Sequence, residues 1–170
     1  SAGLITRVVA FAGTNDLCDW VTNLDAAKGQ QDGLNVHVGF SDSESALAPE
    51  IGNSYLPVPH RTIITGHSLG GALASLNWTA YTFGQPRVLG RGSAKTVDQL
   101  YPDGLYRMRN RSDIVTRIPS AIRFRHFGRQ VLVNRHGESI LEPTLAAELI
   151  DTIVGFRFRA VRDHDVDGYR

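Results

Sequence analysis

Short apolar runs alternate with polar stretches rich in glycine and proline along the whole chain, and they predict alternating strands and helices. Strands are expected near residues 4–11, 35–38, 61–65, 80–84 and 105–110, with a hairpin around 122–134. Helices are expected near residues 43–52, 70–78 and 144–153. This alternation is typical of a three-layer α/β fold, in which helices flank a mostly parallel central sheet.

The length and composition indicate one domain over residues 1–170. The chain has no repeat, low-complexity tract or linker that would divide it, and 42% of its residues are hydrophobic. No apolar run of 18 residues could span a membrane, so we expect a soluble protein. The expected strand at 4–11 begins without a preceding signal segment, which predicts a processed or trimmed start. The single cysteine, Cys18, excludes an internal disulfide and leaves the compartment open.

A serine in a glycine-flanked turn is the strongest chemical signal in the chain. The β-branched run Thr62–Thr65 meets the pentapeptide Gly66-His67-Ser68-Leu69-Gly70, and an apolar helix-forming stretch follows. This strand, turn and helix are typical of a nucleophile elbow, which holds a serine in a strained backbone conformation and projects its hydroxyl from the sheet. The helix N-terminus would direct backbone N–H groups at an anion forming beside Ser68.

A serine nucleophile needs a base and an orienting carboxylate, and in this type of fold they follow in the order Ser, Asp, His. Asp113 follows the expected strand 105–110 at the carboxyl edge of the sheet and is our candidate acid, with Asp98 and Asp103 as competitors. The candidates for the base are His126, His136 and His164. His164 follows the apolar segment 154–161 in a loop near the C-terminus, where a catalytic role and an exposed or structural role are equally open.

Six blocks of sequence, taken together, resemble the class 3 lipases, the fungal-type triacylglycerol lipase family of α/β-hydrolases. The resemblance runs from about Val8 to Tyr169, and so many blocks in the family's order are far more specific than one motif. The blocks are Val8–Thr14, Asp19-Trp20, His37–Phe40, Gly66–Ala74, Phe83–Val88 and Asp113–Pro119.

The resemblance implies an activity and a set of site residues. Ser68 would be the nucleophile, Asp113 the triad acid and His164 the base, while Thr14 and the backbone N–H of Leu69 would hold the oxyanion. The implied function is a serine carboxylic-ester hydrolase that cleaves lipid esters without a cofactor. A phospholipase A1 or a short-chain esterase on the same residues is the alternative, and the resemblance weakly favours secretion.

The sequence departs from the family pattern at three places. Ala12 replaces the arginine usual before the Gly-Thr pair, Asn23 replaces an acid usual after the tryptophan, and only Thr79–Tyr81 separate the helix ending near Trp78 from the following strand block. The short connection indicates a truncated helix or a missing segment. These departures also suggest a non-enzymatic alternative, a catalytically decayed lipid-binding protein.

The segment after Thr14 carries an apolar stripe at helical spacing, formed by Leu17, Trp20, Val21 and Leu24. A helix packed on the core is one interpretation. The functional one is a candidate lid within residues 12–27, whose apolar face covers the acyl site and makes transient contact with a lipid interface when open.

Charge is uneven along a chain whose net charge is only +1. Residues 105–135 contain eight arginines against Asp113 alone. Their alternation puts each strand's arginines on one face, which predicts a solvated sheet face, with binding of anionic lipid headgroups as the alternative. No base-reading motif is present, so no nucleic-acid partner is expected. The alternating arginines are Arg107, Arg109 and Arg111 in one strand and Arg123 and Arg125 in the other.

Residues Asp163–Gly168 match the first half of an EF-hand calcium loop, with acids at positions 1, 3 and 5 and glycine at position 6. The sequence ends before the glutamate that such a loop needs at position 12. We therefore expect no metal site, and the resemblance assigns His164 to the triad instead.

Overall fold

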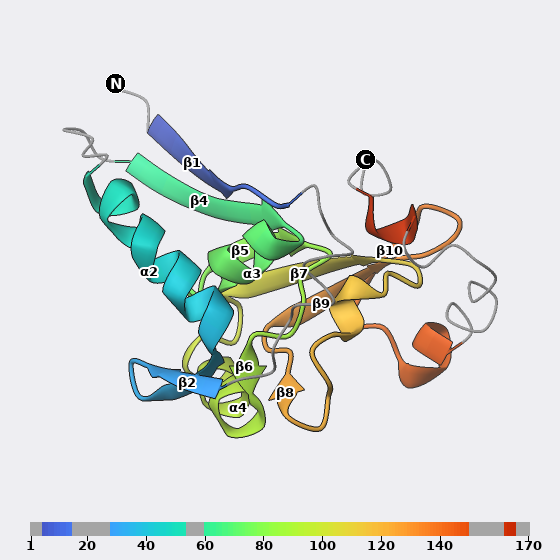
Figure 1. Ribbon diagram of the computed structural model, residues 1–170. Coiled ribbons are helices and arrows are strands. Elements are labelled where there is room, and N and C mark those ends of the chain that lie inside the picture. The colour runs from blue at the N-terminus through green and yellow to red at the C-terminus, as the bar shows by residue number, and fades with distance from the viewer. Residues whose placement is uncertain (1–4, 15–27, 54–59, 150–161, 166–170) are drawn as a thin grey trace.

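A six-stranded, mostly parallel sheet forms the centre of the computed structural model, which describes residues 5–14, 28–53, 60–149 and 162–165 (Figure 1). The strand order is β1-β4-β5-β7-β9-β10. Five neighbouring strands are parallel and β10 returns antiparallel, so the predicted mostly parallel sheet is confirmed. The strands are β1 (Ile5–Phe11), β4 (His60–His67), β5 (Ala80–Phe83), β7 (Leu105–Asn110), β9 (Arg129–Val133) and β10 (Ser139–Leu141).

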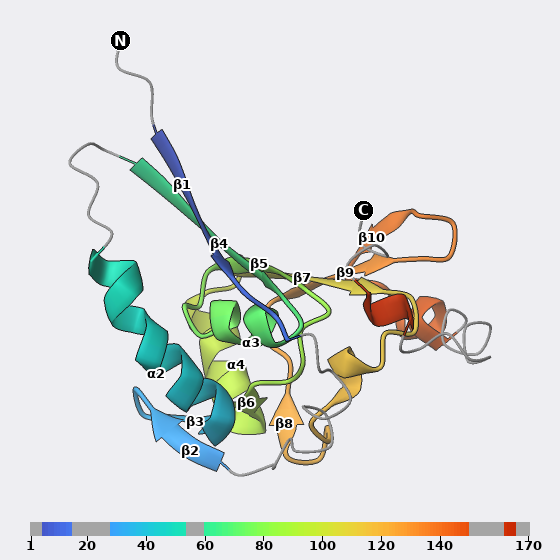
Figure 2. The same ribbon diagram turned by 45° about the horizontal axis from the view of Figure 1, so that its top comes forward.

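Helices pack on this sheet and join it to a smaller one. Helix α3 (Leu69–Ser75) lies against β1, β4 and β5, and α2 (Val38–Asn53) packs beside α3 (Figure 2). Helix α4 (Arg91–Leu100) lies against the smaller sheet, which is antiparallel with the order β2-β3-β6-β8. Its strands are β2 (Lys28–Gln31), β3 (Leu34–His37), β6 (Leu89–Gly90) and β8 (Phe124–Arg125).

The core lies between the sheet and the helices. Its fully buried side chains include Val36, Phe40, Leu89, Val97 and Leu105, which come from both sheets, α2 and α4. The parallel strands bring their carboxyl ends to one edge, at the right of Figure 1, and the loops that leave this edge hold the residues of chemical interest.

Several element boundaries differ from the sequence expectation. Helix α2 begins at Val38 rather than at residue 43, and α3 ends at Ser75 rather than at 78. The chain then turns through Trp78, whose φ of 63° is left-handed, and enters β5 at Ala80. Four residues, 76–79, therefore connect α3 to β5. Residues 145–149 are helical, and the rest of the helix expected at 144–153 falls largely outside the described residues.

The hairpin expected around residues 122–134 is wrong. Phe124–Arg125 pairs with β6 in the small sheet, whereas β9 pairs with β7 in the large one. The local alternation was correct for both strands, but the partner of each is set by distant residues. A hairpin does form one strand later, between β9 and β10.

Glycines allow the backbone of α3 to touch the ends of β1 and β4. A Cβ at Gly70 would overlap the carbonyl oxygen of Phe11, and a Cβ at Gly66 would overlap that of Gly70. This close approach holds the start of α3 against the carboxyl ends of both strands.

We predict that Gly70→Ala lowers the free energy of unfolding by about 3 kcal/mol, because the added methyl meets backbone atoms that cannot move aside. Gly92→Ala in α4 is the control, since nothing lies within 4 Å of a Cβ there. It should be neutral or stabilising by up to about 1 kcal/mol. Urea unfolding of both variants measures the difference, and equal stabilities would contradict the close approach.

Candidate active site

Ser68 lies at the sharp turn between β4 and α3. Its φ of 58° and ψ of −123° fall outside the regions usual for a residue with a side chain, and such strain costs roughly 1–3 kcal/mol. The neighbouring backbone holds it there, because the Ser68 N–H donates to the Phe83 carbonyl at 2.9 Å and its carbonyl accepts from the Ala72 N–H at 3.1 Å. The strained serine predicted from the motif is therefore present at the carboxyl edge of the sheet.

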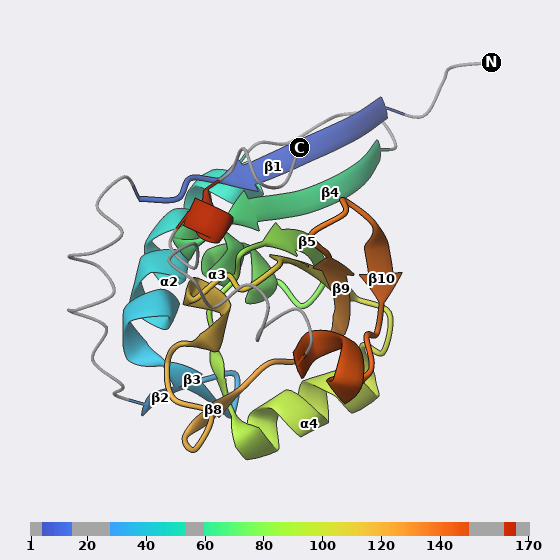
Figure 3. The same cartoon turned by 90° about the vertical axis from the view of Figure 1, so that its right-hand side faces the viewer.

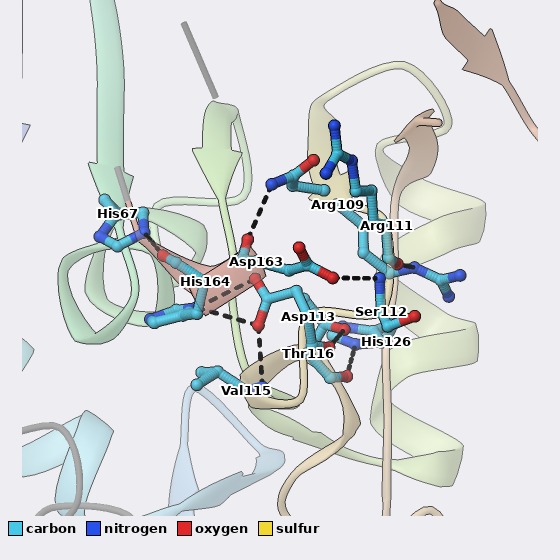
Figure 4. Close-up of polar contacts among 11 residues, drawn as sticks. His67, Arg109, Arg111, Ser112, Asp113, Val115, Thr116, His126, Asp163 and His164 are labelled. Atoms are coloured by element: carbon cyan, nitrogen blue, oxygen red, sulfur yellow. Dashed lines mark hydrogen bonds and ion pairs between the residues drawn. The ribbon is translucent and has the colours of Figure 1, made fainter. Parts of the chain in front are cut away.

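Asp113 lies in the loop that follows β7 and is fully buried. Its Oδ1 accepts the N–H of Val115 at 2.9 Å, at the start of the 3-10 turn η1 (Val115–Arg117). Both carboxylate oxygens lie within hydrogen-bond distance of His164 Nδ1, at 3.0 and 2.9 Å (Figure 4). The structure thus pairs the predicted acid with one of the three candidate histidines.

His164 belongs to the short turn η2 (Arg162–His164), drawn in red beside the end of β4 in Figure 3. The Asn110 side-chain amide donates to the Asp163 carbonyl at 2.9 Å, and the Ser112 N–H donates to the Asp163 carboxylate at 3.3 Å. His67 Nε2 lies 2.7 Å from the His164 carbonyl, and the two imidazole rings are 4.6 Å apart. These contacts fix the position of His164 relative to β4 and β7.

The carboxylate of Asp113 sets the proton on His164. Because a carboxylate accepts hydrogen bonds, Nδ1 of His164 carries a proton that it donates to Asp113. Nε2 of His164 and Oγ of Ser68 are both buried, and neither has a hydrogen-bond partner within the described ranges. The structure therefore joins Asp113 to His164 and places Ser68 at the same sheet edge, without a hydrogen bond between serine and histidine.

His67, the residue before Ser68, remains neutral beside this pair. Burial lowers its pKa, and the neighbouring His164 lowers it further. A neutral His67 donates its Nε2 proton to the His164 carbonyl and places no positive charge next to the second imidazole.

Thr14 follows the carboxyl end of β1 and is half-buried. The preceding Gly13 lies against the elbow, because a Cβ on it would be 3.0 Å from the His67 carbonyl oxygen and 3.7 Å from the Ser68 Cβ. Leu69 is the first residue of α3. The structure therefore brings the segment ending at Thr14 close to Ser68. The candidate lid residues Leu17, Trp20, Val21 and Leu24, like Cys18 and Asn23, lie outside the described residues.

The competing acids and histidines are engaged elsewhere. Asp98 accepts the Gly128 N–H at 2.6 Å, and Asp103 forms an exposed ion pair with Arg129 at 2.9 Å. His126 Nε2 lies 2.7 Å from the Thr116 carbonyl, and His136 is exposed.

Only Asp163, His164 and Asp165 of the EF-hand-like segment lie within the described residues. The Asp163 carboxylate is buried and accepts the Ser112 N–H. Over the described ranges the chain holds no group of three or more His, Cys, Asp or Glu side chains placed to bind a metal ion. Asp167 and Gly168 lie outside those ranges.

The predicted solvated arginine face of β7 is wrong, although Arg123 and Arg125 are exposed as expected. Arg107 and Arg109 are each only 9% exposed. They follow Leu105 at spacing 2 and so share its core-facing side of the strand. The guanidinium of Arg107 donates to the Phe127 carbonyl at 2.6 Å, which compensates part of the cost of burying it. The alternation in the sequence correctly predicted that Arg107 and Arg109 lie on the same face of the strand. It did not predict that this face is buried.

No helix within the described residues is long and apolar enough to cross a membrane. This agrees with the composition.

Known proteins resemble this chain over most of its length. The family model for lipase (class 3) matches residues 8–122. A lipase of Rhizomucor miehei is 30% identical over 151 residues, covering 74% of this chain and 41% of the relative. A protein of Oryza sativa subsp. indica named phospholipase A1-II 1 is 28% identical over 153 residues, covering 66% of this chain and 39% of the relative. This chain thus spans about two fifths of these curated relatives.

The fold is shared with solved lipase structures. A triacylglycerol lipase, described in its structure as having a serine protease triad as its catalytic centre, aligns with a TM-score of 0.73. The alignment has 27% identity and covers 94% of this chain and 69% of that one. Together, the mostly parallel sheet and the serine elbow define an α/β-hydrolase. The chain belongs to the class 3 lipase family.

Gly84 makes room for the buried Asp113–His164 pair. Its φ is +58°, and a Cβ on it would lie 2.8 Å from both the Asp113 carboxylate and the His164 ring. We predict that Gly84→Ala displaces this pair and lowers kcat by about 100-fold or more for any reaction in which the pair takes part, because misplacement of about 1 Å has that effect.

Gly33→Ala is the matched control, since Gly33 also has a positive φ, +76°, but nothing lies within 4 Å of its Cβ position. Both variants put a side chain at a positive φ, but only Gly84 lies against the Asp113–His164 pair. If the two lose the same small fraction of kcat, the tight fit around Gly84 does not matter for activity.

The partly buried His126 should make stability depend on pH. Burial, and secondarily the Arg107 charge, holds the pKa of His126 well below its ordinary 6.5. Near pH 6.5 the unfolded chain therefore binds a proton that the folded protein does not bind. The free energy of unfolding falls as the pH drops below that value. The slope per histidine approaches about 1.4 kcal/mol per pH unit.

We predict that His126→Gln, which retains a donor for the Thr116 carbonyl, reduces this slope between about pH 6.5 and 5. His136→Gln is the matched control at an exposed site. Urea unfolding across this pH range measures both slopes. Parallel curves for wild type and His126→Gln would show that His126 titrates normally.

Proposed function

We propose that this protein is a serine hydrolase that cleaves carboxylic esters of lipids through an acyl-enzyme. The observation that carries the proposal is the buried Asp113–His164 hydrogen bond at the sheet edge where Ser68 is held in a strained elbow. A carboxylate and an imidazole without a chemical role would ordinarily lie in solvent. A histidine that acts as a base needs a buried carboxylate to orient its ring.

In the proposed mechanism, Nε2 of His164 takes the proton of Ser68 as its Oγ attacks the ester carbonyl. Asp113 holds the imidazole in the tautomer with Nδ1 protonated and stabilises the positive charge that develops on it. The backbone N–H of Leu69 and the donors of Thr14 hold the tetrahedral oxyanion. His164 then protonates the departing alcohol, and water cleaves the acyl-enzyme by the same path in reverse.

Triacylglycerol-like lipid esters are the proposed substrates, on the strength of the relatives named as lipases. Phospholipid cleavage at the A1 position is the second candidate, because a phospholipase A1 relative matches at nearly the same identity. Contact with a lipid interface through the candidate lid, and secretion, belong to the same proposal. The mechanism uses no cofactor.

We predict that Ser68→Ala, Asp113→Asn and His164→Ala each lower kcat by roughly 10⁴-fold while the folded state persists. Asp98→Asn and His136→Ala are the controls, because both residues are engaged or exposed away from the site. Turnover close to that of the wild type in any of the three would remove that residue from the triad.

Labelling by a fluorophosphonate separates the enzyme from a decayed lipid-binding protein, since only an activated serine reacts. The label should map to Ser68 and be absent from His164→Ala. Initial rates on triacylglycerol, phospholipid and short-chain nitrophenyl esters then decide between the two substrate classes. A protein that neither labels nor turns over any of these esters would overturn the proposed function.

A further inference from the structure

The proposed nucleophile and base lie on parts of the chain that are held in place very differently. Ser68 directly follows β4, whose pairing with β5 extends as far as His67, opposite Phe83. His164 lies in the three-residue turn η2, which is too short to keep its shape or position by itself. The distance between the base and the serine therefore depends on the side-chain contacts that attach this turn to the sheet.

Contacts from β7 and its following loop attach one side of the turn. Asn110 and Ser112 donate to Asp163, and the carboxylate of Asp113 accepts from His164. These bonds place the turn relative to the acid. They do not join it to β4, so a rotation of the turn about them would move the base relative to the serine while the acid–base pair stayed intact.

His67 attaches the other side of the turn to the elbow. Its Nε2 lies 2.7 Å from the carbonyl oxygen of His164, a residue 97 positions away, and carries the proton because a carbonyl accepts (Figure 4). The two imidazole rings are tilted by 30° with their centroids 4.6 Å apart, which is a usual separation for packed rings. One side chain, next to the nucleophile in the sequence, thus contacts both the backbone and the ring of the base.

We propose, on the basis of the function given above, that His67 is a positioning residue that sets the distance between Ser68 and His164 during ester cleavage. The hydrogen bond to the His164 carbonyl transmits the rigid position of β4 to the turn. It acts through His164 and takes no proton from the substrate or the serine.

Three substitutions at His67 separate the hydrogen bond from the packing of the ring. Phenylalanine keeps a ring of similar size but has no donor for the carbonyl. Glutamine has no ring, but its amide N–H groups lie about as far from the backbone as Nε2 of histidine. Asparagine has the same amide on a side chain that is one methylene shorter. We expect the donor at the right distance, rather than the ring, to determine the rate.

His67→Phe should lower kcat on a short-chain nitrophenyl ester by about tenfold to 100-fold, because misplacement by about 1 Å costs about 100-fold. KM should stay within about twofold, as expected when an interaction of the transition state is impaired. His67→Gln should keep kcat within about threefold of the wild type, because it retains the hydrogen bond. His136→Phe is the control, since it makes the same substitution at an exposed site.

Amide hydrogen exchange measures the attachment of the turn without any turnover. Ser112 is buried and its N–H donates to the Asp163 carboxylate, so this N–H can exchange when the turn moves away. His67→Phe should speed its exchange about fivefold to tenfold, as expected for the loss of one hydrogen bond, and His67→Gln should change it by less than about twofold. The Gly128 N–H, which donates to the Asp98 carboxylate, is the control amide.

A kcat for His67→Phe within about twofold of the wild type would overturn the proposal, and so would an equal loss in His67→Phe and His67→Gln. If His67→Phe does not fold, His67→Asn replaces it with the same expected losses. Failure of the ester hydrolysis itself is recognised separately, because the wild type would then neither turn over esters nor label at Ser68. The exchange of the Ser112 amide in that case still decides whether His67 holds the turn.

Discussion

The arrangement of the candidate site depends on polar docking of a three-residue turn at the carboxyl edge of a parallel sheet. Asp163 and His164 are almost completely buried, and hydrogen bonds hold them there: Asn110 and Ser112 donate to Asp163, and the Asp113 carboxylate accepts from His164. Buried polar groups destabilise a protein unless each forms a hydrogen bond. Few other positions of this turn would satisfy all of these groups. The parallel topology supplies the partners, because the loops leaving adjacent strands meet there.

Much of this arrangement follows from local sequence, and the rest depends on distant residues. The strand at 105–110 has the predicted bounds, because its alternation is strong and glycine punctuates its start. The hairpin β2–β3 was missed, although Asp32-Gly33, both at positive φ, is a strong hairpin signal, because the flanking strand is polar. The pairing of Asp113 with His164 was expected through the family resemblance. Local sequence left three histidines open, since the choice rests on contacts 51 residues apart.

The burial of charged side chains was the feature that the sequence predicted least well. A strand of alternating arginines is ordinarily solvated, and nothing in the spacing of Arg107 and Arg109 reveals that their face is the core face. Only the fold brings the carbonyls of Phe127 and Gly128 to Arg107. Burial, and secondarily the charge of Arg107, lowers the pKa of the neighbouring His126, so this packing also decides how that histidine titrates.

The seven-residue helix α3 has a consequence for how the protein opens. So short a helix has no stability of its own, and residues 70–75 are all buried, so its shape is maintained by the core. The backbone of Ser68 therefore belongs to the most cooperative unit of the molecule. The turn carrying His164 is held by a few polar bonds and opens in smaller fluctuations. Amide exchange in α3 should track global unfolding, and the two halves of the site should separate, on warming, before the core melts.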